Sequence, residues 1–264
     1  MHLTGTTGLG KTQWGQSLAQ ALGVSFNRVR FAEGIQAFEI TGMHDRKGGQ
    51  LEIQRGPLFS QIFMADGLCN AQPKIQSVLM DAMEDQTVIV EGEKYYLPEP
   101  FFVISTNEGI RQLPETLADR FMLTLSMDYP GVAAEKQVLQ MYTQAPKIDN
   151  QEPICSAESL IMAKQEVQAV AVEDSILNYI VSLTETTRRI GAVQTGVSLR
   201  GSIALLKVAK SYAAIQGRDF VIMDDIRSLA LPVLVHRIVL RPDAIREGIQ
   251  PDRIIESILA GRRL

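Results

Sequence analysis

With 264 residues, the chain is long enough for one large domain or two modest ones, each with a hydrophobic core. Apolar residues make up 45% of it and charged residues 21%, which is typical of a globular protein. The net charge of −4 disfavours a protein that binds nucleic acid over its whole surface. Two cysteines are too few for a disulfide framework, and no apolar run approaches the roughly 20 residues that span a bilayer. Since no signal-peptide pattern opens the chain either, we expect a soluble, cytoplasmic protein.

The stretch Gly5–Thr12 fits the phosphate-binding pattern G-x-x-x-x-G-K-[ST], the P-loop. Glycines let the backbone turn tightly and present N–H groups to a polyphosphate, and the helix N-terminus that follows adds partial positive charge. Lys11 is expected to reach the β- and γ-phosphates, and the Thr12 hydroxyl to ligate Mg²⁺. The alternative is a glycine-rich turn that binds nothing. The predicted nucleotide contacts are Gly5, Gly8, Leu9, Gly10, Lys11, Thr12 and Gln13.

The first half of the chain alternates strand-like and helix-like stretches, which favours a parallel α/β sheet with ligands at the strand C-termini. After the P-loop helix, the predicted elements are a strand over Phe26–Phe31, a loop over Gly34–Gly56 with a short hairpin at Leu51–Ile53, a buried strand over Ile62–Asp66, a helix from Pro73, a hairpin over Thr87–Leu97, a buried strand over Phe101–Thr106, a short helix ending near Leu117–Arg120, and a strand over Phe121–Leu125.

The second half changes character from about Pro130 onward, where apolar residues recur at spacings of three and four. One such stripe contains Ile176, Ile180 and Leu183, and others lie around residues 203–209 and 226–235. This periodicity predicts a helical bundle. We therefore expect an α/β domain over residues 1–130 and a helical domain over residues 131–264, with a linker at Ala145–Pro153.

Asp66 ends a buried strand, where a P-loop ATPase places the carboxylate that holds Mg²⁺ directly or through water. A simple strand-capping aspartate is the alternative. In ATPases of this architecture the next residue is usually a glutamate that polarises the attacking water. Here that position is Gly67, which has no side chain to orient or deprotonate a water molecule.

Three further polar residues are candidates for contacts at the γ-phosphate. Asn107 follows the strand Phe101–Thr106 and is placed to hydrogen-bond the phosphate or the attacking water, or else serves only the turn. Arg120 can stabilise phosphoryl-transfer charge in trans, unless it forms a surface ion pair with a neighbouring carboxylate. Arg200, at a helix start in the second half, can reach a γ-phosphate or is a solvated arginine.

An ordered set of motifs resembles the MoxR-type AAA+ ATPases over nearly the whole chain. It comprises the P-loop, Glu39–Gly42, Arg55–Phe59, Pro73–Ser77, Ala82–Asp85, Val90–Glu93, Leu97–Val103, Leu113–Glu115, Asp119–Phe121, Ser198–Arg200, Arg218–Asp219, Asp224–Ile226 and His236–Ile238. A P-loop alone fits many folds, whereas this ordered set is much more specific. The resemblance implies an α/β P-loop AAA+ core, with a parallel sheet flanked by helices, followed by an all-helical lid domain.

The resemblance also implies a nucleotide-dependent homo-oligomeric ring, usually a hexamer, that uses ATP and Mg²⁺ to remodel or activate client proteins. By that analogy Lys11 and Thr12 form the phosphate site and Asp66 the Mg²⁺ site. Asn107 falls near sensor 1, Arg120 matches the arginine finger that acts in trans, and Arg200 matches sensor 2. Family members commonly work with a partner that carries a von Willebrand factor A-type domain.

The sequence departs from the family pattern in three places. The catalytic glutamate position is Gly67, and the following Asn and Arg positions are Cys69 and Asn70. The sensor 1 segment is short, so the family asparagine aligns with either Asn107 or Glu108. The chain also starts at the P-loop strand, so we expect either a fragment or an incomplete adenine pocket.

Two functional hypotheses follow. The first is a working ATPase that hydrolyses ATP slowly, because the loss of a water-orienting carboxylate typically costs about 10²–10⁴-fold in rate. The second is a catalytically impaired, nucleotide-binding scaffold or regulatory subunit. A nucleic-acid motor is disfavoured by the acidic charge balance and by the absence of a basic stripe in the sequence.

Overall fold

The computed structural model describes residues 1–264 except 33, 48–49, 108–112, 144–151 and 262–264. The chain forms two compact units. The core unit consists of His2–Gln112 and Ser126–Leu160, and the lid unit of Leu113–Leu125 and Ile161–Leu264 together with Met1. The lid unit therefore includes a short segment from the first half of the chain. The expected boundary near residue 130 stays a prediction, and part of the expected linker at Ala145–Pro153 lies outside the described residues.

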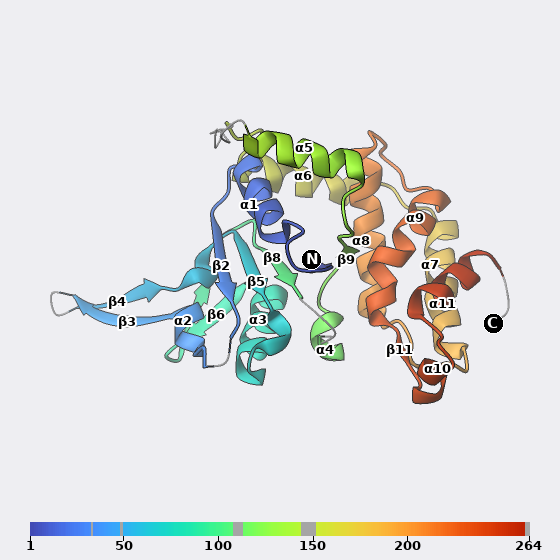
Figure 1. Ribbon diagram of the computed structural model, residues 1–264, viewed down its shortest axis with the longest axis horizontal. Helices are drawn as coiled ribbons and strands as arrows, with labels where there is room; N and C mark the ends of the chain where they lie inside the picture. Colours follow the sequence, from blue (N-terminus) through green and yellow to red (C-terminus); the bar gives the residue numbers. More distant parts are fainter. Residues whose placement is uncertain (33, 48–49, 108–112, 144–151, 262–264) are drawn as a thin grey trace. The chain divides into compact units, whose positions relative to one another are not determined.

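A five-stranded sheet with the order β2-β5-β8-β1-β9 lies at the centre of the core unit (Figure 1). Its strands are β1 (His2–Thr4), β2 (Phe26–Arg30), β5 (Ile62–Asp66), β8 (Phe102–Thr106) and β9 (Thr124–Ser126). The β2/β5, β5/β8 and β1/β8 pairs are parallel. Parallel strands end at the same edge of a sheet, so the residues that follow β1, β5 and β8 share one edge. The predicted parallel α/β sheet is confirmed.

Helices with one apolar face cover this sheet. In α1 (Lys11–Ala21) the buried residues are Lys11, Gly15 and Ala19, at helical spacing. A Cβ on Gly15 would lie 3.3 Å from the Met64 sulfur, so α1 approaches β5 closely. The helix predicted from Pro73 is α3 (Pro73–Asp85), which buries Ile75, Leu79 and Ala82. The remaining helices that begin in the core unit are α2 (Ala37–Thr41), α5 (Val132–Thr143) and α6 (Ala157–Ala169).

The prediction of a loop over Gly34–Gly56 is wrong for most of that stretch. After α2, β3 (Gly42–Lys47) and β4 (Gln50–Arg55) pair antiparallel over six residue pairs and form a ribbon that projects from the core unit (Figure 1). The glycines serve close backbone approach: a Cβ would lie 2.1 Å from the Gln54 oxygen at Gly42 and 2.3 Å from the Ile40 oxygen at Gly56. The stretch looked like a loop because these glycines and many charged residues hide the strand signal.

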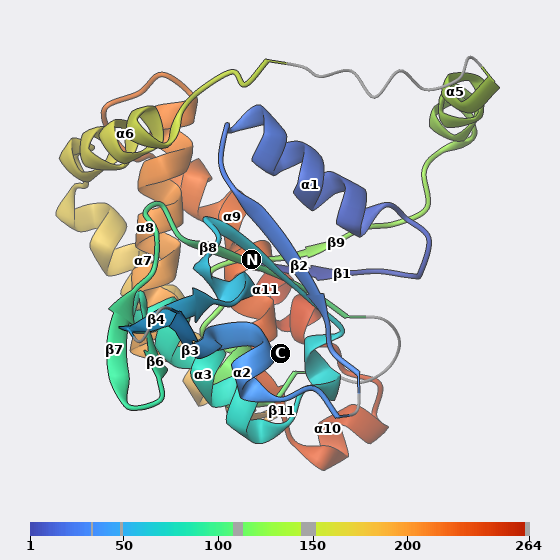
Figure 2. The ribbon, with the colours of Figure 1, turned by 90° about the vertical axis from the view of Figure 1, so that its left-hand side faces the viewer.

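The predicted hairpin over Thr87–Leu97 is confirmed as β6 (Thr87–Val90) and β7 (Glu93–Tyr96). It lies beside the β3–β4 ribbon (Figure 2). His44 on β3 bridges the two, with its Nδ1 2.9 Å from Glu91 Oε2 and its Nε2 2.8 Å from the Tyr95 hydroxyl. The strand predicted over Phe121–Leu125 is displaced to Thr124–Ser126, because Phe121 is buried in the lid unit and its carbonyl lies 2.9 Å from His236 Nε2.

The lid unit is built around four helices that pack on one another: α7 (Asp174–Arg189), α8 (Leu199–Ile215), α9 (Met223–Leu234) and α11 (Pro251–Leu259). Their shared core includes Ile180, Leu183, Leu205, Ile226 and Ile255. The helices predicted from the apolar stripes are thus confirmed, but Ile203 of the second stripe is exposed, and α8 buries Ala204, Leu205 and Ala209. Smaller elements are α4 (Glu115–Ala118), α10 (Pro242–Arg246) and the short antiparallel pair of β10 (Val193–Thr195) and β11 (Val239–Leu240). Within the described residues, no helix is long and apolar enough to cross a membrane.

A buried ion pair stabilises the start of α9. Both Asp225 oxygens accept hydrogen bonds from Arg218, at 2.6 and 2.8 Å, and one also accepts from the Ile222 N–H at 2.9 Å. Burial alone raises the pKa of Asp225, but the Arg218 and Ile222 hydrogen bonds outweigh it, so the pKa lies below its ordinary value. The stabilising effect is therefore present above the unfolded-state pKa of about 4 and is lost as the pH falls below it.

We predict that Asp225→Asn destabilises the protein by about 1–3 kcal/mol at pH 7, because Arg218 loses its charged partner. Since the substitution removes the titrating group, the free energy of unfolding should also depend less on pH between pH 5 and 3. Urea unfolding across that range measures both effects. Asp224→Asn is the control, because Asp224 forms only an exposed pair with Arg227. Equal losses in the two variants would contradict the prediction.

Candidate functional site

The P-loop connects β1 to α1 and needs glycine at defined positions. Gly5, Gly8 and Gly10 have φ angles of 131°, 87° and 80°, in the region that favours glycine. At Gly5 a Cβ would lie only 2.3 Å from the Met127 oxygen, so no side chain fits there. This tight curve lies immediately before the N-terminus of α1, and its role in phosphate binding stays a prediction.

Lys11 lies inside the curve of the P-loop. Its side chain is buried, and Nζ donates hydrogen bonds to the Gly5 oxygen at 2.9 Å and the Thr6 oxygen at 2.7 Å. Thr12, which is half-buried, and the exposed Gln13 follow in the first turn of α1. An ammonium group enclosed by a loop at the N-terminus of an eleven-residue helix is an arrangement that favours phosphate oxygens.

Asp66 ends β5 at the same edge of the sheet. Its Oδ1 accepts a hydrogen bond from the Thr106 hydroxyl, and its Oδ2 accepts from Arg28 Nε at 3.1 Å and from Arg28 Nη2. Burial raises the pKa of Asp66, but the Thr106 hydrogen bond and the Arg28 charge outweigh it and bring the pKa below its ordinary value. Asp66 is therefore ionised at neutral pH.

Gly67 and Asn107 follow β5 and β8 at this edge. Gly67 has φ 70°, and its N–H donates to the Thr106 oxygen at 3.0 Å. A Cβ there would meet no atom closer than 3.4 Å, so the backbone conformation, rather than lack of space, favours glycine. Asn107 is buried, and its Oδ1 accepts a hydrogen bond from the Cys69 thiol at 2.6 Å. Glu108, the other candidate for sensor 1, lies outside the described residues.

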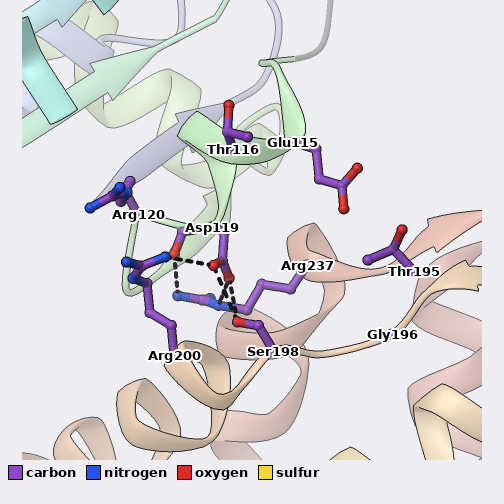
Figure 3. A pocket seen from close by; sticks show the side chains of 9 residues that line it. All are labelled: Glu115, Thr116, Asp119, Arg120, Thr195, Gly196, Ser198, Arg200 and Arg237. Atoms are coloured by element: carbon purple, nitrogen blue, oxygen red, sulfur yellow. Dashed lines mark hydrogen bonds and ion pairs between the residues drawn. The ribbon is translucent and has the colours of Figure 1, made fainter. Parts of the chain in front are cut away.

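The two predicted arginines lie together in the lid unit. Arg120 and Arg200 both line a cavity of about 220 Å³, together with Asp119, Ser198 and Arg237 (Figure 3). The remaining lining residues are Glu115, Thr116, Thr195 and Gly196. The structure thus brings together two residues that are 80 positions apart in the sequence. Lys11, Asp66 and Asn107 belong to the core unit.

Asp119 is the acceptor at the centre of this cavity. Arg200 Nη1 donates to Asp119 Oδ2 at 3.1 Å, and the Ser198 hydroxyl donates to Oδ1 at 3.1 Å (Figure 3). Arg237 Nε lies 3.1 Å from Oδ1 in a second ion pair. Asp119, one of the carboxylates considered as a surface partner of Arg120, forms ion pairs with Arg200 and Arg237.

Arg237 is the buried anchor of the cluster, with a side chain only 1% exposed. Its Nη2 donates to the Asp119 and Phe121 oxygens at 3.2 and 2.7 Å, and its Nη1 donates to the Val233 oxygen. Burial lowers the pKa of Arg237 to about 10, although Asp119 partly offsets the effect, so the group stays charged at neutral pH. These bonds tie the segment that carries Arg120 to the C-terminal end of α9.

Sequence reasoning gave Arg28 no role, considered Asp119 only as a surface ion-pair partner of Arg120, and noted Ser198 and Arg237 only as parts of family motifs. Arg237 had a visible signal, because it is a lone charge in the apolar run Leu234–Leu240. Arg28 alternates with apolar residues on a predicted strand, which normally indicates an exposed side chain. Strand register does not give the Arg28–Asp66 pair either, because it places Met64 opposite Arg28 and Asp66 opposite Arg30.

Comparisons with known proteins agree with this geometry. Residues 1–123 match the model of the ATPase family associated with various cellular activities (AAA), and residues 185–258 match the AAA lid domain. The chain is 40% identical to the uncharacterized protein YeaC of Bacillus subtilis over 260 residues, which cover 96% of this chain and 81% of that protein. It is 29% identical to Chaperone MoxR1 of Mycobacterium tuberculosis over 273 residues, 97% of this chain and 72% of that one. The chain belongs to the MoxR-type family of AAA ATPases.

A solved structure supports the same assignment over the whole chain. A crystal structure of a Cytophaga hutchinsonii protein, described as a candidate ATPase, has a TM-score of 0.91 and 29% identity. The match covers 99% of this chain and 84% of that one. Membership confirms the predicted fold class and makes this chain a nucleotide-binding ATPase of the AAA family.

The Arg28–Asp66 pair predicts how the site responds to Mg²⁺. Because Arg28 occupies Asp66 Oδ2, a metal ion or its water ligand must share or displace that contact. We expect Arg28→Gln to lower the Mg²⁺ concentration for half-maximal nucleotide binding by about 2- to 5-fold, the effect of a partly exposed ion pair. A fluorescent ATP analogue titrated with Mg²⁺ measures it. Arg30→Gln on the same strand is the control, and a raised Mg²⁺ requirement in Arg28→Gln would show instead that Arg28 supports metal binding.

Proposed function

We propose that the chain binds Mg-ATP, hydrolyses it slowly, and works as a chaperone-like homo-oligomeric ring, a hexamer by family analogy, that remodels or activates client proteins. The observation that carries the proposal is Lys11, enclosed by a glycine-dependent loop at a helix N-terminus. Because the strands are parallel, this loop, Asp66 and Asn107 all lie at the same edge of the sheet. A partner with a von Willebrand factor A-type domain belongs to the same proposal.

In the proposed nucleotide complex, backbone N–H groups of Gly5, Gly8, Leu9, Gly10 and Gln13 surround the phosphates, and Lys11 binds the β- and γ-phosphate oxygens. The Thr12 hydroxyl and the Asp66 carboxylate would hold Mg²⁺. Oxygen ligands, one of them kept ionised by its surroundings, fit this hard cation. When bound, Mg²⁺ neutralises charge on the β- and γ-phosphate oxygens.

Slow turnover follows from the residues beside the site. Gly67 has no side chain to orient the attacking water, so Asn107 is the remaining candidate for this role among the described residues that follow β5 and β8. Its Oδ1 accepts a hydrogen bond from Cys69, and an asparagine amide N–H is a donor that suits a phosphate or water oxygen. A catalytically impaired scaffold or regulatory subunit is the second candidate, and the positive φ at Gly67 favours it.

We propose that Arg120 and Arg200 act together on the γ-phosphate of a neighbouring subunit. Both line the same cavity of the lid unit, so a phosphate that reaches one guanidinium lies within the reach of the other. Arginine stabilises transferring phosphoryl groups because its planar charge pairs with several oxygens at once. A trans action of both residues supports the ring.

The first test compares the unmodified chain with Lys11→Ala, Gly67→Glu and Gly67→Ala. We expect Lys11→Ala to abolish Mg-ATP binding, whereas Gly67→Glu keeps it and raises steady-state hydrolysis by at least 10-fold. Gly67→Ala controls for strain, because any side chain at φ 70° costs roughly 1–3 kcal/mol. Binding that survives Lys11→Ala would contradict the P-loop assignment. Equal turnover in the unmodified chain and Gly67→Glu would contradict the slow-turnover proposal.

The second test concerns the ring. We expect light scattering after size-exclusion chromatography to show assembly that depends on Mg-ATP, and Arg120→Ala to weaken it by at least 10-fold in the ATP required. Nucleotide binding at the P-loop of the same variant should stay within 2-fold of normal, since Arg120 lies in the lid unit. A chain that stays monomeric in every nucleotide state would contradict the proposed trans role.

A further inference from the structure

We propose that Asp119 is a positioning residue of the ATPase reaction, which holds Arg120 and Arg200 in one fixed arrangement. This inference rests on the proposed action of both arginines at a γ-phosphate. Asp119 is joined to each by a different route: it precedes Arg120 in the chain, and its Oδ2 accepts a hydrogen bond from Arg200 Nη1 at 3.1 Å. A displacement of Asp119 therefore shifts the backbone that carries Arg120 and breaks the hydrogen bond that holds Arg200.

Asp119 is itself restrained by contacts with Arg237 and Ser198. Arg237 Nε lies 3.1 Å from Oδ1, and Arg237 Nη2 donates to the Asp119 backbone oxygen at 3.2 Å. The Ser198 hydroxyl donates to the same carboxylate and also caps α8, where it accepts from the Gly201 N–H at 3.3 Å. Arg237 and Ser198 thus restrain the Asp119 side chain, and Arg237 also restrains its backbone.

The exposed fraction of the side chain decreases from Arg200 through Asp119 to Arg237. The Arg200 side chain is 44% exposed, Asp119 is 18% exposed, and Arg237 is 1% exposed. A buried arginine packed this tightly cannot move to a ligand: a Cβ on Gly201 would already lie 2.7 Å from Arg237 Cδ. Arg200 is therefore the member of this chain of ion pairs that a phosphate can reach, and Arg237 is a fixed support.

Charge makes the arrangement selective for an anion. Three arginines line the cavity, whereas its carboxylates are Asp119 and Glu115, so the cavity keeps a net positive charge. The carboxylate of Asp119 also separates Arg200 from Arg237, which would otherwise repel each other. A neutral side chain at position 119 would leave that repulsion in place and let Arg200 turn toward solvent.

An opposite role for Asp119 makes the opposite prediction. If the carboxylate only competed with phosphate for Arg200, its removal would free Arg200 and strengthen the response to ATP. Asp119→Asn separates the two roles, because it keeps the size of the side chain and its ability to accept a hydrogen bond while removing its charge. Asp224→Asn is the matched control, since it removes one partner of an exposed Asp–Arg pair in the same lid unit.

The first measurement is amide hydrogen exchange of the full chain. In Asp119→Asn, we expect amides of Leu117–Phe121 and of the first turn of α8 to exchange about 5- to 10-fold faster, because the local ion pairs no longer oppose opening. Asp224→Asn should leave these amides unchanged. Unchanged exchange in Asp119→Asn would overturn the inference, whatever the chain does with ATP.

The second measurement is the ATP concentration for half-maximal assembly. We expect Asp119→Asn to raise it by about 3- to 10-fold, while the affinity of the isolated chain for a fluorescent ATP analogue stays within 2-fold. In an Arg200→Ala background, Asp119→Asn should have a smaller effect, since only one of the two arginines that Asp119 is proposed to position, Arg120, remains. A full effect there, or a lower ATP requirement in Asp119→Asn, would overturn the inference. If the unmodified chain does not assemble, the proposed ring fails and the role of Asp119 in the ATPase reaction fails with it, whereas faster exchange in Asp119→Asn would still show that Asp119 restrains this segment.

Discussion

The parallel pairing of β1, β5 and β8 is the constraint on which the nucleotide site depends. Because these strands run the same way, the P-loop after β1, Asp66 at the end of β5 and Asn107 after β8 come to one edge of the sheet. Each needs a neighbour from another strand: Asp66 is oriented by Thr106 of β8 and Arg28 of β2. The site is therefore a product of the strand order, and no single motif contains it.

The sequence predicted those parts of the fold whose signals are local. The run Ile62–Ala65 is apolar because β5 lies between β2 and β8, where all five of its residues, including the final Asp66, are buried. The β3–β4 ribbon was predicted only as a short hairpin at Leu51–Ile53, because Gly42 and Gly56, which allow close backbone approach, resemble turn residues in the sequence. Phe121 was misplaced because burial in the lid unit and burial in a strand leave the same apolar signal.

The candidate site shows the same division. Gly5, Lys11 and Thr12 were predictable because the P-loop is a local pattern with a fixed chemistry. Arg28, Asp119 and Arg237 were not, because each acts through a partner that is distant in sequence: Arg28 and Asp66 are 38 residues apart, and Arg237 bonds to a segment 116–118 residues away. A charged residue reveals its exposure through periodicity, but it does not reveal its partner.

Gly67 separates nucleotide binding from hydrolysis in physical terms. The contacts that favour phosphate, namely Lys11 inside its loop and the N-terminus of α1, involve no atom of Gly67. Its left-handed backbone is compatible with the turn into the helical segment Leu68–Asn70, which brings Cys69 against Asn107. Gly67 thus supports the conformation of the segment Leu68–Asn70, but it supplies no group for proton transfer. In this chain, the proposed triphosphate contacts and the proposed water-activating position are different residues. A substitution at Gly67 can therefore change ATP hydrolysis without removing the contacts proposed to bind ATP.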